Sequence, residues 1–257
     1  MEPGRTSWGP VHVAWAAVPV AEPVAAPAAG SGGDARHALR DARHELRVAR
    51  RALGHELLIT LLSELATDAG VHADVGADDA ADDAADDAAA AITRRCATCG
   101  AADHGAPVVA GAPVVVSIAY AERGVAVAAA PQAQAAAVGV DFERVPAAGR
   151  HATLTELGAL FTPGAAPSLE EWTLLEAALK ADSRGLRVEL ADCVIVEAPE
   201  GASPQNADGA PERAVRIPDR PDAIAVAVLT GPEGFVLSAA MIPAVSPNAI
   251  PTAPPPP

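Results

Sequence analysis

The stretch of sequence that most constrains the fold is VGVDFE, residues 138–143. It predicts the end of a β-strand that carries two carboxylates. Asp141 and Glu143 are separated by one residue, and in a strand such residues point to the same face. We therefore expect both carboxylates to lie together on one side of a sheet.

A second stretch, WTLLEAALK at residues 172–180, predicts a helix that carries a third carboxylate. Glu176 and Lys180 are one helical turn apart, so they share a face of that helix. Three oxygen ligands from two rigid elements suit a Mg²⁺ ion that keeps some of its waters and holds a substrate phosphate. The residues alone leave an alternative open, namely a solvated strand end and an exposed helical ion pair.

These stretches, with three weaker ones in the same order, resemble motifs of the 4′-phosphopantetheinyl transferases of the surfactin-synthetase-activating type. CATCG (96–100) followed by HGAP (104–107) is similar to a C-x-x-C-G…H-G-[KR]-P segment of actinobacterial members. VSIAYA (116–121) falls where the family has a V-S-[LI]-S-H-S strand. FTPG (161–164) resembles the turn before the family's tryptophan helix. The likeness covers roughly residues 94–190.

The resemblance implies an α+β fold made of two similar α+β halves in one chain, with the active-site cleft between them. It implies that CoA and an apo acyl or peptidyl carrier protein are the substrates, and that a carrier serine attacks the β-phosphorus of CoA. Mg²⁺ would be the cofactor, held by Asp141, Glu143 and Glu176. The resemblance makes Glu176, or a water bound to the metal, the candidate base for the serine hydroxyl, and it places Lys180 against the phosphates and the leaving group.

Contacts to CoA are implied for a further set of residues: Arg47, Arg51, His104, Ser117, Tyr120 and Lys180. The chain departs from the family at Ala106, Tyr120 and Leu175, where the family has cationic or hydrogen-bonding residues. The loss of each charge-assisted contact typically costs about 1.5–3 kcal/mol. Two functions therefore stay open. One is transfer of phosphopantetheine in polyketide, peptide or fatty-acid synthesis. The other is a transferase-like protein without that activity, which binds or acts on carrier-tethered chains in a natural-product pathway.

The domain organisation expected from the sequence is an N-terminal half over residues 1–112 and a C-terminal half over 113–243. The first half contains two insertions of low complexity, 19–33 and 77–91, and a proline-rich tail follows at 244–257. Hydrophobic periodicity predicts helices and strands at these positions: strand 12–18, helix 34–66, a hairpin over 113–130, helices 153–161 and 168–181, strand 186–196, and a hairpin of strands 224–229 and 235–241.

The net charge of −15 argues against nucleic acid as a partner, since a phosphate backbone demands cationic contacts. An acidic carrier protein would need a local basic or apolar patch on such a surface. The three cysteines imply no disulfide framework, and Cys96, Cys99 and His104 lack the fourth ligand of a structural zinc site. The apolar stretch 12–29 is interrupted by prolines, which is atypical of a signal peptide or a membrane helix. We expect a cytoplasmic monomer.

Overall fold

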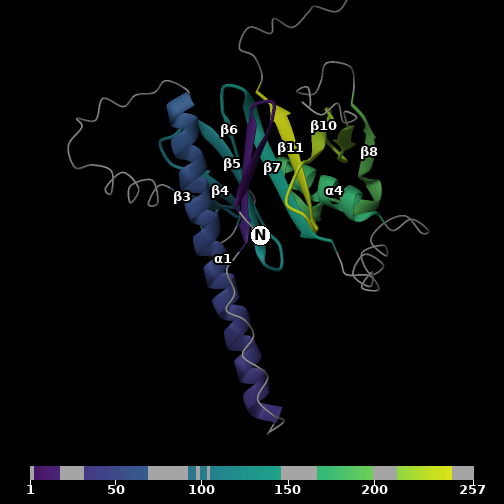
Figure 1. The fold of residues 1–257 in the computed structure, drawn as a ribbon. Coiled ribbons are helices and arrows are strands. Elements are labelled where there is room, and N and C mark those ends of the chain that lie inside the picture. The colour runs from purple at the N-terminus through teal and green to yellow at the C-terminus, as the bar shows by residue number, and fades with distance from the viewer. Residues whose placement is uncertain are drawn as a thin grey trace, which may run out of the picture.

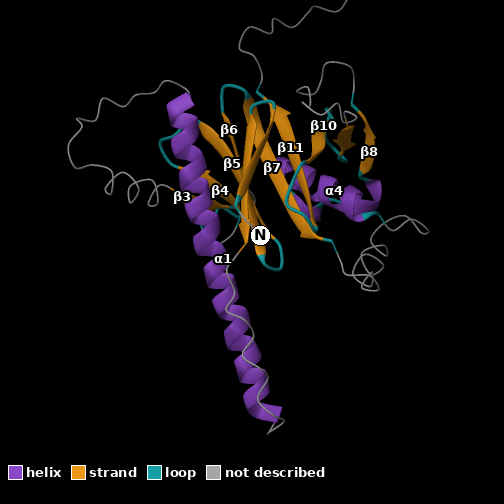
Figure 2. Cartoon of the chain, in the orientation of Figure 1, coloured by secondary structure: helices purple, strands orange, loops and turns teal. Residues whose placement is uncertain are grey.

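The computed structural model describes residues 3–17, 32–68, 92–96, 99–102, 105–145, 167–198 and 213–244. In these ranges the chain is an α+β structure of four layers, with two antiparallel sheets packed face to face and one helix on each outer face (Figures 1 and 2). None of the helices in the described ranges is both long and apolar enough to cross a membrane.

The first sheet has the strand order β1-β2-β6-β5, and helix α1 covers its outer face. Its elements are β1 (Gly4–Trp8), β2 (Val11–Ala17), α1 (Gly32–Asp68), β5 (Val114–Tyr120) and β6 (Gly124–Pro131). A two-stranded ribbon of β3 (Ile92–Arg95) and β4 (Ala106–Val109) lies beside β5.

The second sheet has the order β7-β11-β10-β9-β8, and helix α4 covers its outer face. Its elements are β7 (Ala135–Arg144), α4 (Leu169–Asp182), β8 (Val194–Glu197), β9 (Arg213–Arg216), β10 (Ile224–Leu229) and β11 (Phe235–Pro243). Between α4 and β8 the chain forms two short 3-10 turns, Gly185–Arg187 and Leu190–Asp192.

Strand β6, with the sequence GVAVAAAP, lies between two layers and is buried on both faces. Val125 and Val127 pack under α1, while Ala126 and Ala128 face the second sheet. A strand that is covered on both faces is expected to be a continuous apolar run rather than an alternating one. The small alanines let the two sheets pack closely.

Gly139 determines how closely α4 approaches β7. A Cβ atom at this position would lie 1.9 Å from the carbonyl oxygen of Ala177 and 2.8 Å from the amide nitrogen of Ala181. No other residue fits there without moving the helix. The glycine of the VGVDFE stretch thereby places the middle of α4 directly on β7, on the face of the strand that also carries Asp141.

Most of the elements expected from the sequence are confirmed, with two differences. The strand expected at 186–196 is wrong over its first half, where the chain makes the two 3-10 turns instead, and only Val194–Glu197 is extended. The change from the first sheet to the second lies at residues 132–134, not at the expected boundary of 112 and 113, because β5 and β6 belong to the first sheet.

Some expectations lie outside the described residues. These are the insertion at 77–91, residues 19–31 of the first insertion, the helix at 153–161, and the tail beyond residue 244. The last two residues of the first expected insertion, Gly32 and Gly33, belong to α1.

Candidate functional site

Asp141 and Lys180 form the centre of the candidate site. Asp141 lies on the face of β7 that α4 covers, and its side chain is 3% exposed. The Lys180 ammonium donates to Asp141 Oδ1 at 2.6 Å and to the backbone carbonyl of Val140 at 3.0 Å. A buried carboxylate needs a partner, and the closely packed helix supplies one.

The three predicted carboxylates come together around this pair. Lys180 Nζ lies 3.7 Å from Glu176 Oε2, one turn earlier on α4. Burial, followed by repulsion from Asp141, raises the pKa of Glu143 from its ordinary value of 4.5 to about 7. The same two causes raise the pKa of Glu176 to about 7. A hydrogen bond from Glu176 to Asp141 also contributes, because only a protonated Glu176 can donate that bond. Carboxylates that share a site resist simultaneous ionisation, as these do.

The donor chemistry of this carboxylate cluster fits a hard cation. Asp141 Oδ2 is buried and has no hydrogen-bond partner. A cation there would satisfy that oxygen and relieve the repulsion that raises the two glutamate pKa values. In the described residues, however, no three His, Cys, Asp or Glu side chains are already spaced to hold a metal ion. Lys180 also occupies Oδ1 of Asp141. Metal binding would require these side chains to rearrange.

A cavity of about 630 Å³ adjoins the cluster on the side of the C-terminal end of α4. Its walls come from the β3–β4 ribbon, the edge strand β5, the start of β7 and the end of α4. Among its described lining residues are five cationic side chains and no carboxylate: Arg94, Arg95, Lys180, Arg184 and Arg187. On a chain of net charge −15 the charged lining of this cavity is locally cationic, although Lys180 is paired with Asp141 and Arg184 with Asp182.

Two of the predicted CoA contacts lie on opposite faces of β5. Ser117 is buried, lines the cavity and accepts a hydrogen bond from the amide of Val140 at 3.1 Å, so that it links the two sheets. Tyr120 instead belongs to the cluster under α1, where its ring lies against Gly54. Strand alternation predicts this separation for residues three apart.

The three departures from the family pattern have different surroundings. Ala106 is exposed in the cavity wall, where it offers no polar side-chain group. Leu175 is 3% exposed and packs in the apolar cluster between α4 and the second sheet. A lysine at position 175 would therefore be buried among apolar side chains, which would destabilise the protein instead of restoring a phosphate contact.

The remaining predicted contacts are on α1 or outside the described residues. Arg47 and Arg51 are exposed on α1, and Arg50 between them donates to the carbonyl of Ala121 at 2.5 Å. His104 lies outside the described residues, so its expected role and its grouping with the two cysteines stay predictions. Cys96 is buried and Cys99 is exposed.

Sequence reasoning missed the arginines that follow α4. Arg184 is bonded to Asp182 at 2.5 Å, and Arg220 reaches the same buried carboxylate at 3.1 Å. Arg187 donates to the carbonyl of Ser183. Basic residues after the C-terminus of a helix are common because they favour its dipole, so nothing in the sequence marked these arginines as the wall of a cavity.

Comparison with known proteins identifies no relative on which to rest an assignment: no protein-family model and no curated protein sequence matches the chain.

Proposed function

We propose that this protein is a 4′-phosphopantetheinyl transferase that moves the phosphopantetheine arm of CoA to a serine of an apo acyl or peptidyl carrier protein. One observation carries the proposal. The three carboxylates that match the family's ligands meet around Lys180, at the edge of a cavity whose charged lining is cationic. An anionic ligand in the cavity would thus have its reacting end near the cluster.

The carboxylates Asp141, Glu143 and Glu176 would hold Mg²⁺. When bound, the ion would neutralise charge on the pyrophosphate of CoA. Lys180 lines the cavity and contacts the cluster, and in this proposal its ammonium would stabilise negative charge on the departing 3′,5′-ADP. Glu176 would accept the proton of the carrier serine as the general base. Its pKa of about 7 belongs to the cluster without a cation, and bound Mg²⁺ would lower it.

The second candidate is a transferase-like protein that keeps the cavity but does not transfer the arm. Ala106 favours it, because this exposed wall residue lacks the cation that the family has at that position. The ion pair of Lys180 with Asp141 favours it as well, because it satisfies one oxygen of the buried carboxylate without a metal. Such a protein would bind carrier-tethered chains in the cavity.

The deciding experiment incubates the protein with CoA, Mg²⁺ and an apo carrier protein and weighs the carrier by mass spectrometry. The proposal expects a mass gain of one phosphopantetheine group. It expects Asp141→Asn, which keeps the shape of the side chain, to abolish the gain. Arg216→Ala, a change at an exposed arginine of β9, serves as the control and should leave the gain intact. Absence of a gain with the wild type, where a reference transferase modifies the same carrier, rejects transfer and leaves the second candidate.

A further inference from the structure

Lys180 is the only lysine in the chain, which has seventeen arginines. The two cations differ, since arginine presents a planar fork to its acceptors and lysine a compact point charge. The ammonium of Lys180 donates to Asp141 Oδ1 at 2.6 Å and to the carbonyl oxygen of Val140 at 3.0 Å, and it lies 3.7 Å from Glu176 Oε2. A chain that otherwise uses arginine therefore places its one compact cation in the carboxylate cluster.

This ammonium occupies the position that a metal ion bound to Asp141 would need. The side chain of Asp141 is 3% exposed, and Lys180 takes one of its oxygens while the other, Oδ2, is buried without a hydrogen-bond partner. A Mg²⁺ ion would need carboxylate oxygens at about 2.0–2.1 Å. Two cations on one buried carboxylate repel each other strongly. Metal binding to Asp141 therefore requires the ammonium to move away.

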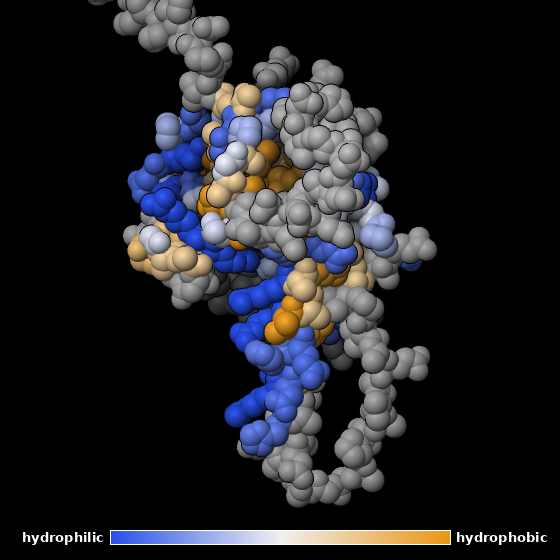
Figure 3. Space-filling view, turned by 90° about the vertical axis from the view of Figure 1, so that its left-hand side faces the viewer, coloured by the Kyte–Doolittle hydropathy of each residue, from blue (hydrophilic) through white to orange (hydrophobic). Residues whose placement is uncertain are grey.

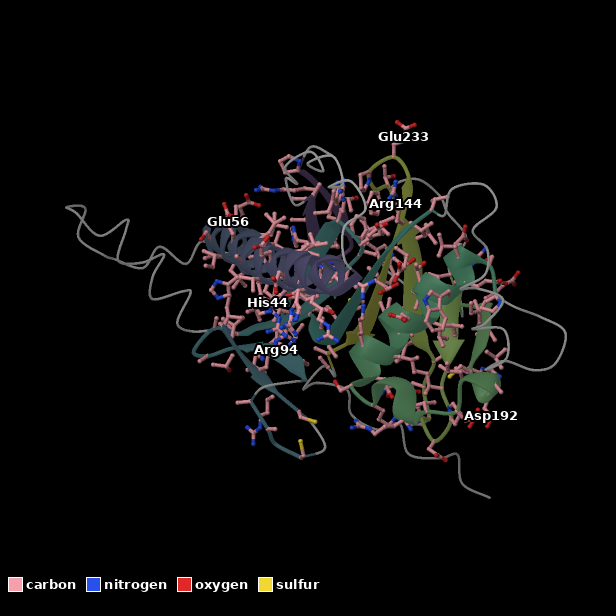
Figure 4. All side chains as sticks on the ribbon, turned by 90° about the horizontal axis from the view of Figure 1, so that it is seen from below. His44, Glu56, Arg94, Arg144, Asp192 and Glu233 are labelled. Carbon is pink, nitrogen blue, oxygen red and sulfur yellow. The ribbon has the colours of Figure 1, made fainter. Side chains whose placement is uncertain are left out.

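The cavity at the end of α4 is the other place that the ammonium can occupy. Lys180 is 32% exposed and lines this cavity. The other charged side chains among its described lining residues are Arg94, Arg95, Arg184 and Arg187. Of these, only Arg184 is paired with a carboxylate of the described residues. Arg94, labelled in Figure 4, comes from β3, and α4 is the green helix in that view. An ammonium that swings to this wall meets like charge, so an anion in the cavity would favour the move.

The arginines of α1 do not contribute to this balance of charge. Helices α1 and α4 cover opposite outer faces of the two packed sheets (Figure 1), and Figure 3 shows the α1 side, where the surface of the helix is largely hydrophilic. The cations that Lys180 would join are therefore those of the β3–β4 ribbon and of the turn after α4.

We propose that Lys180 is an exchangeable internal cation that couples the two ligands of the site, so that a divalent ion and an anion bind together and each binds weakly alone. The ion replaces the ammonium on Asp141, and the released ammonium moves to the cavity wall, where the anion holds it. This inference rests on the proposed function for the identity of the anion, which is CoA. Since coupling free energies are reciprocal, the ion should strengthen CoA binding by the same factor as CoA strengthens ion binding.

The test is the affinity for Mn²⁺, which shares the preference of Mg²⁺ for oxygen ligands, measured from the electron paramagnetic resonance signal of the free ion. Lys180→Met removes the charge and retains a long, unbranched side chain. If the ammonium is displaced in fewer than about a tenth of wild-type molecules, the variant should bind Mn²⁺ alone at least about tenfold more tightly. With saturating CoA the gain should be below about threefold, because the anion then stabilises the displaced ammonium of the wild type.

The matched control is Arg95→Met, which removes one cation from the same wall at an exposed residue that makes no ion pair with the carboxylate cluster. It should weaken CoA binding but change the affinity for Mn²⁺ alone less than about twofold, because an exposed charge is screened. Acidic segments elsewhere in the chain are the same in all three proteins, so the differences report on this site. An equal gain in both variants, or no gain in Lys180→Met, would overturn the proposal.

A second measurement follows the lysine itself and needs no variant. Because Lys180 is the only lysine, protein grown with ¹³C-labelled lysine gives one set of lysine side-chain signals in its NMR spectrum. CoA and Mg²⁺ together should move the signal of the Cε methylene to a position that neither ligand produces alone at the same concentration. A signal that stays in place when both are bound would show that the ion pair with Asp141 persists, and it would overturn the proposal even if Lys180→Met failed to fold.

The failure of this exchange can be distinguished from the failure of the proposed reaction. Coupled binding that depends on Lys180, without any mass gain of a carrier protein, rejects the transfer and supports the exchange. A mass gain of the carrier, with no tighter binding of Mn²⁺ by Lys180→Met, keeps the transfer and overturns the exchange. Absence of Mn²⁺ binding by the wild type even with CoA also overturns the exchange.

Discussion

Replacement of Glu176 by glutamine should make the protein more stable at mildly alkaline pH. In the folded state the pKa of Glu176 is raised from 4.5 to about 7, first by burial and then by repulsion from Asp141. Between these pH values the folded protein keeps a proton that the unfolded chain has released. Each pH unit in this window therefore lowers the free energy of unfolding by about 1.4 kcal/mol.

Over the full window, from pH 4.5 to about 7, ionisation of Glu176 lowers the free energy of unfolding by at most about 3 kcal/mol. The stabilising effect of the bound proton is complete below pH 4.5 and is lost as the pH rises to about 7. The side chain is 26% exposed, and solvent screening will reduce this figure. Since glutamine does not titrate, Glu176→Gln should match the wild type near pH 4.5 and exceed its stability above pH 7 by about 1–3 kcal/mol.

Urea unfolding of both proteins across this pH range is the measurement. Glu189→Gln, which replaces an exposed carboxylate outside the cluster, controls for the change in net charge. Addition of Mg²⁺ above pH 7 should stabilise the wild type more than Glu176→Gln, since a ligand that binds only the folded state raises the free energy of unfolding. Parallel stability curves for the wild type and Glu176→Gln would refute the account of the cluster.

Three further changes test the framework around the site. Gly139→Ala should lower the free energy of unfolding by about 3 kcal/mol in denaturant titrations, because the added methyl group would overlap the carbonyl of Ala177. A decrease below about 1 kcal/mol would show that α4 moves easily. Ser168→Ala should lower the free energy of unfolding by about 1 kcal/mol through loss of the capping box of α4, while Ser168→Asp should retain most of the stability. Thr173→Val should lower the free energy of unfolding by about 1–3 kcal/mol, because it leaves the buried Ser238 hydroxyl without its partner at 2.8 Å. Adding Ser238→Ala should recover part of the loss if that hydroxyl is the cause.

Local patterns predicted the elements that bear the site. The two-residue spacing of Asp141 and Glu143 and the four-residue spacing of Glu176 and Lys180 were sufficient to place each pair on one face. Their meeting depends on Gly139, whose lack of a side chain brings helix and strand together. The sequence contains that glycine, but only the three-dimensional packing reveals which carbonyl it accommodates.

The cavity and its arginines could not be predicted in the same way. Arg94 and Arg184 are far apart in the chain, and they come to one cavity through the ribbon β3–β4 and the turn after α4. The strands of this ribbon are four residues each, too short for a periodic signal. The turns at Gly185–Arg187 and Leu190–Asp192 hold apolar residues that mimic a strand pattern, which is why a strand was expected there.

The apolar layer between the two sheets has a consequence for how the chain folds. Trp8, Val13 and Phe142 are buried in one cluster to which both sheets contribute, so each sheet covers an apolar face of the other. If the chain were cut at residues 132–134, each fragment would expose that face to water and would be expected to aggregate. Unfolding should therefore be a single cooperative transition, with the same midpoint whether it is followed at the tryptophans of the first sheet or at Trp172 of α4.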